Sequence, residues 1–155
     1  IDGCSAPNHS CSLQGLARAM AWFASAEDRS DSASQAAVRL VNAMNAHPAL
    51  VAGEGRACTQ LMRAMGGSGV IKTGAEGVFT AILPQQRLGI ALKIDDGTTR
   101  ASDAAIAALL VHLGVLALDH PTTQMYVNAP QRNWRGITTG RLGISPTFLP
   151  QLAQI

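Results

Sequence analysis

Apolar residues recur every three or four positions in the first part of the chain, which is the spacing of amphipathic helices. This pattern predicts a helix at about 12–25 and a short helix around 61–65. Between them a second helix is expected to begin at Asp31 or Ser32, since either side chain can cap it. His47-Pro48 should end that helix, because the residue before a proline disfavours the helical backbone.

The pattern changes to that of strands at Val70. Residues 70–83 read as one strand with a glycine-marked irregularity, and 88–94 as a second strand, antiparallel because the connection is short. Thr99 is then expected to cap a long helix that has Asp103 in its first turn. Helices followed by a hairpin and a covering helix predict an α+β fold, in a single domain or half-domain that spans 1–155.

The composition limits the classes of function. With 155 residues and 47% hydrophobic content the chain can build a core, but only 14% of its residues are charged. Since about 25% is usual, we expect another chain or segment to cover part of the surface. A net charge of +2 with scattered arginines argues against nucleic acid, and no apolar run approaches the ~18 residues of a membrane span.

Two further features concern the state of the chain. The first residue, Ile1, is not an initiator methionine, so we expect a processed piece or an excerpt, without a signal peptide in this form. Three cysteines at irregular spacing favour reduced thiols and a cytoplasmic protein over a disulfide framework.

Lys72-Thr73-Gly74 is the clearest candidate for chemistry, because the chain has only one other lysine, Lys93. In β-lactamase-like serine hydrolases a Lys-Thr-Gly places a cation and bare backbone beside the substrate. These enzymes also need a Ser-x-x-Lys, but the residues three positions before the two lysines are Gly69 and Ile90. The sequence therefore predicts one wall of such a site without its nucleophile.

On one continuous strand, Lys72, Gly74 and Glu76 would point to the same face. The alternative interpretation is structural: Lys72 would be a lysine at a strand end that pairs with Glu76.

Two loops are weaker candidates. Cys4 lies in a polar turn, where an accessible thiolate could bind zinc, although the sequence offers no CxxC or histidine at ligand spacing. Residues 53–56 resemble a shortened phosphate loop, but the preceding strand and the lysine of such a loop are missing. We therefore exclude nucleotide binding and leave Cys4 open between a ligand and an ordinary thiol.

Several segments taken together resemble the L-asparaginase II family, the thermolabile, rhizobial-type asparaginases. The matching segments are IDGCSAPN at 1–8, LARAMAWFA at 16–24, HPALVAGEGR at 47–56, KTGAEGVFTAILP at 72–84, LGIALKIDDGTTRAS at 88–102 and RNWRG at 132–136. The family is about twice as long, so the resemblance implies the carboxy-terminal half of a protein with a β-lactamase/transpeptidase-like fold.

The resemblance implies hydrolysis of L-asparagine to aspartate and ammonia by serine acyl transfer, with the Ser-x-x-Lys on an absent amino-terminal half or companion chain. Lys72 would be catalytic, and residues 74–77 (Gly74, Ala75, Glu76 and Gly77) would bind the substrate. Cys4 would be one ligand of Zn²⁺ and Asp2 its neighbour. A homo-oligomer, such as a dimer, is also expected. The alternatives are a related amidase or glutaminase, and an inactive binding or assembly fragment.

Overall fold

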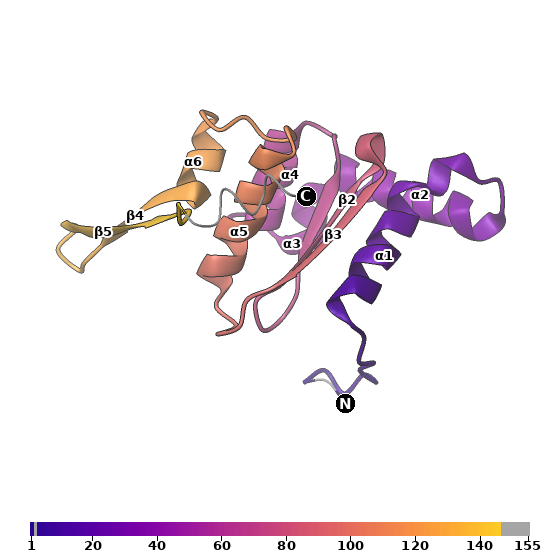
Figure 1. The fold of residues 1–155 in the computed structure, drawn as a ribbon, viewed down its shortest axis with the longest axis horizontal. Coiled ribbons are helices and arrows are strands. Elements are labelled where there is room, and N and C mark those ends of the chain that lie inside the picture. The colour runs from indigo at the N-terminus through magenta and orange to yellow at the C-terminus, as the bar shows by residue number, and fades with distance from the viewer. Residues whose placement is uncertain (2, 147–155) are drawn as a thin grey trace.

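A computed structural model describes residues 1 and 3–146 as an α+β fold (Figure 1). This confirms the fold class expected from the alternation of helical and strand periodicity. None of the helices in these residues is long and apolar enough to cross a membrane. In chain order the elements are α1 (Leu13–Ala24), η1 (Ala26–Asp28), α2 (Ser32–Ala46), α3 (Pro48–Ala52), α4 (Ala57–Met65), β1 (Val70–Thr73), β2 (Val78–Leu83), η2 (Pro84–Gln86), β3 (Leu88–Lys93), α5 (Thr99–His112), α6 (Pro121–Val127), β4 (Asn128–Arg132) and β5 (Thr138–Gly143).

The first three strands form an antiparallel sheet in the order β1-β2-β3. The prediction of a single strand over 70–83 is wrong, because the chain reverses between β1 and β2. Glu76 and Gly77 both have left-handed backbones, with φ of 58° and 69°. The amide of Gly74 donates to the carbonyl of Val78 at 2.8 Å and closes the turn. Glu76 therefore lies in a tight hairpin connection and not on a strand face with Lys72.

Helix α1 crosses β3 at very short range, and Gly89 is the residue that allows it. A Cβ atom on Gly89 would lie 2.0 Å from the backbone nitrogen of Ala21 and 2.4 Å from the carbonyl oxygen of Ala17. Only a residue without a side chain fits between two backbones at this distance. Small residues on the helix and on the strand thus bring α1 onto one side of the sheet (Figure 1).

Helices α4, α5 and α6 enclose the core together with the sheet. The amphipathic patterns predict this burial correctly for Leu61 and Met62 of α4 and for Ile106 and Leu110 of α5. Phe79 of β2 is buried in the same core. A fully buried aliphatic or aromatic side chain of this kind stabilises the fold by about 1.5–3 kcal/mol. The apolar stripe of α5 is therefore what fixes the helix against the hairpin.

The helix boundaries agree closely with the sequence pattern in the first half of the chain. Asp31 caps α2, since its carboxylate accepts the amide of Ser34 at 2.9 Å, and His47-Pro48 ends that helix. The start of α5 differs, because Thr98 occupies the capping position and Asp103 lies beyond the first turn.

Three parts of the fold have no strong periodic signal in the sequence. They are the five-residue helix α3, the seven-residue helix α6, and the hairpin formed by β4 and β5. This hairpin, residues 128–143, projects from the body beyond α6 (Figure 1), and we call it the arm.

Candidate active site

Lys72 lies near the end of β1 with its side chain exposed at the protein surface. Its ammonium group donates to the carbonyl of Thr73 at 2.7 Å. Within the described residues it forms no ion pair with Glu76, so the pairing that would give this lysine a purely structural role is not made. The site is open, and the ammonium is available to a ligand or to another polypeptide.

The turn after β1 gathers the four predicted substrate-binding residues next to Lys72. Gly74, Ala75 and Glu76 are exposed, whereas Gly77 is buried. A Cβ on Gly77 would lie 2.9 Å from the Cβ of Ile94 and 3.0 Å from the backbone of Gly97, so this position holds only glycine. Its left-handed φ imposes the same requirement. The turn therefore presents accessible backbone close to a cation.

A buried thiol anchors the end of β1. The amide of Thr73 donates to the Sγ of Cys58 in α4 at 3.2 Å. Burial raises the pKa of Cys58, while the Thr73 amide and the charge of Lys72 oppose that rise. Cys58 is fully buried and therefore acts as a neutral acceptor that holds the strand. The sequence around Cys58 does not indicate that its thiol contacts a strand residue fifteen positions later.

Polar side chains from three helices lie near this thiol and share its electrostatic environment. The hydroxyl of Tyr126 in α6 donates to the side chain of Gln60 in α4. Burial raises the pKa of Tyr126 to about 12, and the charges of Asp103 and Cys58 add to the effect. Burial also raises the pKa of Asp103, and Arg56 partly offsets this. Burial therefore favours the neutral forms of Tyr126, Asp103 and Cys58 near the end of β1.

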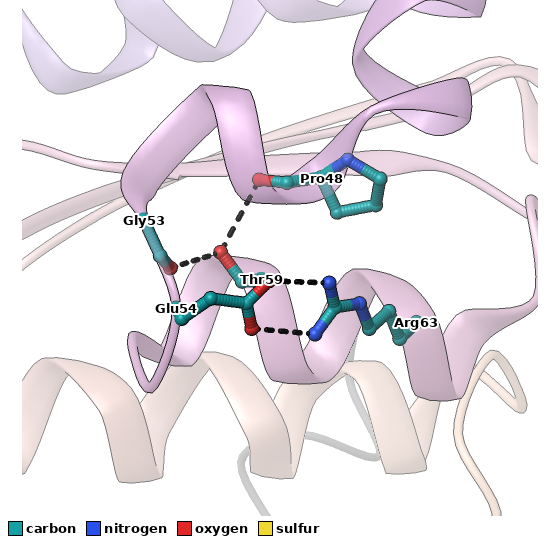
Figure 2. A network of polar contacts seen from close by, with 5 residues as sticks. All are labelled: Pro48, Gly53, Glu54, Thr59 and Arg63. Carbon is teal, nitrogen blue, oxygen red and sulfur yellow. Dashed lines mark hydrogen bonds and ion pairs between the residues drawn. The ribbon is translucent and has the colours of Figure 1, made fainter.

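The loop between α3 and α4 is held by contacts of its own (Figure 2). The buried hydroxyl of Thr59 lies 2.6 Å from the carbonyl oxygen of Gly53 and 3.2 Å from that of Pro48. Across the same loop, Arg63 donates both ends of its guanidinium to Glu54 at 2.7 Å, and this lowers the pKa of Glu54. A helix, and not a strand, precedes this loop, in keeping with the rejection of a phosphate loop.

The predicted metal ligands do not form a complete site among the described residues. Cys4 is exposed in the amino-terminal segment, and Asp2 lies outside the described residues. Among the described residues no three histidine, cysteine or acidic side chains gather in a group that could hold a metal ion. A zinc site in a protein normally needs at least three protein ligands. The described residues alone therefore do not fit zinc, and the role of Cys4 stays a prediction.

The structure thus combines an exposed Lys-Thr-Gly at a strand end with a glycine-containing turn in an α+β fold. The family model for L-asparaginase II matches residues 1–144, so the chain belongs to the L-asparaginase II family. A comparison with curated proteins gave no match. Family membership makes the chain part of an amidohydrolase family and suggests an amino-acid substrate.

Proposed function

We propose that this chain forms one wall of the active site of an L-asparaginase, and that another polypeptide segment supplies the nucleophile. The observation that carries the proposal is the family match over residues 1–144. Lys72 and the turn at 74–77 support it, since they place a cation beside accessible backbone. The residues three positions before the two lysines are Gly69 and Ile90, so a Ser-x-x-Lys has to come from elsewhere.

The proposed chemistry is acyl transfer. The serine oxygen attacks the carbonyl carbon of the asparagine side chain, and the C–N bond breaks as the nitrogen leaves, protonated, as ammonia. Water then attacks the ester, and aspartate and the free serine are released. In this scheme Lys72 activates the serine or supports it electrostatically, and the backbone at 74–77 binds the amino acid.

Zinc is an expectation from the family resemblance, with Cys4 as one ligand. Because the described residues do not complete a site, we assign zinc no step in the reaction. The expectation fails if the zinc content of the complete assembly is the same after Cys4→Ala.

The test compares the two lysines of the chain. Each lies at or near the end of a strand and donates to the carbonyl of the following residue, so Lys93→Ala is a matched control for Lys72→Ala. Intact-mass measurement first establishes whether native material holds a second polypeptide with a Ser-x-x-Lys. In that assembly Lys72→Ala should lower kcat/KM for L-asparagine by at least ~100-fold, whereas Lys93→Ala should leave it unchanged.

Three results would redirect the proposal. Unchanged asparagine hydrolysis by Lys72→Ala would remove the catalytic assignment. Faster release of ammonia from glutamine than from asparagine would keep the roles of the residues and replace the substrate. An assembly without turnover on either amide would indicate a binding or assembly module.

A further inference from the structure

The tip of the arm presents a tryptophan between arginines. Trp134 is completely exposed, and Arg132 and Arg135 beside it are exposed as well. Residues 128–143 contain no aspartate or glutamate, so the charge of the whole arm is positive. A fully exposed tryptophan with basic neighbours is typical of an interaction surface, because tryptophan and arginine are enriched at binding hot spots.

This tip is held in one conformation by its own hydrogen bonds. The side-chain oxygen of Asn133 accepts the amides of Arg135 and Ile137, both at 3.0 Å. The guanidinium of Arg132 donates to the carbonyl of Gly136 at 2.9 Å. A tip that is already ordered loses little conformational entropy when it binds, so Trp134 is preorganised for insertion into a partner.

A cleft of suitable size lies between α1, α2 and the segment before β3. It has a volume of about 280 Å³, and its walls combine the apolar side chains of Phe23, Val38, Val41 and Pro84 with polar residues, which are Asn42, Asn45, Ser68 and Gln85. A cavity of ~150 Å³ is enough to hold a benzene ring, so this cleft has room for an indole. We call it the α1–α2 cleft.

The charge of the cleft complements that of the arm. Glu27 lines it, is exposed, and makes no hydrogen bond or ion pair with any described residue. An indole seated against the apolar part of the lining would bring the flanking arginines of the tip close to this unpaired carboxylate. Opposite charges at the rim of an apolar contact favour association and fix its orientation.

The arm cannot reach the cleft of its own chain. It projects from one end of the long axis, while α1 and α2 lie toward the other end (Figure 1). We propose that the chain associates head to tail, with Trp134 of one copy in the α1–α2 cleft of a second copy. Such a heterologous contact leaves one free arm and one free cleft, so association continues beyond a dimer unless a ring closes.

The proposal goes beyond the proposed activity, because neither surface includes Lys72. Sedimentation velocity of the intact 155-residue chain over a concentration series tests it directly. We expect reversible association that weakens with added salt. Trp134→Ala and Glu27→Arg should each weaken it, the first by roughly 30-fold, as expected for a hot-spot tryptophan. Leu50→Ala, which removes another exposed apolar side chain, should have no effect.

A mixing experiment separates this contact from other modes of association. Trp134→Ala has an intact cleft and Glu27→Arg an intact arm, so an equimolar mixture should form one-to-one complexes that neither variant forms alone. Both residues are exposed, and circular dichroism should show that the variants fold normally. A chain that stays monomeric at all concentrations, association unaffected by Trp134→Ala, or a mixture that remains monomeric would each overturn the proposal.

Discussion

The sheet β1-β2-β3 and the arm are both antiparallel, yet different forces hold them. In β2, Phe79, Ala81, Ile82 and Leu83 are buried under helices. In the arm nearly every residue of both strands is exposed, and the strands are joined mainly by backbone hydrogen bonds. A two-stranded hairpin alone is at best marginally stable in water. Strand pairing therefore gives the arm its shape, whereas packing gives the sheet its stability.

Glycine substitution should show the largest difference between the two regions. Gly89→Ala should destabilise the protein by more than about 4 kcal/mol or prevent folding, because the new Cβ would clash with the backbone of α1. Gly140→Ala in β5 is the matched control, since its Cβ would meet nothing within 4 Å. Urea unfolding measures both. Equal midpoints for the two variants would show that the close contact of α1 with β3 does not exist.

Truncation of large side chains should give the next largest difference. Phe79→Ala removes a completely buried ring from β2 and should cost roughly 3–5 kcal/mol. Ile137→Ala at the tip of the arm removes a side chain that is 52% exposed, and should change stability by less than about 0.5 kcal/mol. The free energy of unfolding is again the measurement. A cost above 2 kcal/mol for Ile137→Ala would mean that the arm packs on the body.

The smallest effect concerns pH. Tyr126, the only tyrosine of the chain, has a pKa raised to about 12 in the folded protein. Between the unfolded value of ~10 and this folded value, the unfolded state has already lost its phenolic proton while the folded state retains it. Stability is therefore constant below this window and falls as pH rises through it, by about 1 kcal/mol after allowance for a half-exposed ring.

The absorbance of phenolate reports this titration without interference from another tyrosine. The midpoint should lie near pH 12 in the native protein and near ~10 in denaturant. In Tyr126→Phe the alkaline loss of stability should be smaller by the same amount. A native midpoint near 10 would show that the ring of Tyr126 is not buried between α6 and α4.

The elements with strong periodicity could be predicted from the sequence. The cap of α2, the proline stop and the apolar faces of α1, α2, α4 and α5 are local signals, and each led to the correct element. The candidate lysine was also found from the sequence, because lysine occurs only twice and one copy precedes Thr-Gly.

Short elements and distant contacts could not be predicted in this way. The left-handed pair Glu76-Gly77 resembled an irregularity in a strand, because the sequence does not show whether a glycine bends a strand or reverses it. Helix α6 and the strands of the arm are short and mix polar with apolar residues, so their sequences carry no clear helical or strand periodicity.

The sequence by itself determined the fold class, the family and the lysine at the end of a strand, since propensity, burial pattern and motif all act over a few neighbouring residues. Only the tertiary structure decided that Cys58 holds the end of β1, that α1 rests on Gly89, and that the arm points away from the body. These features join residues far apart in the chain, and the free energy of such contacts depends on geometry that no local pattern encodes.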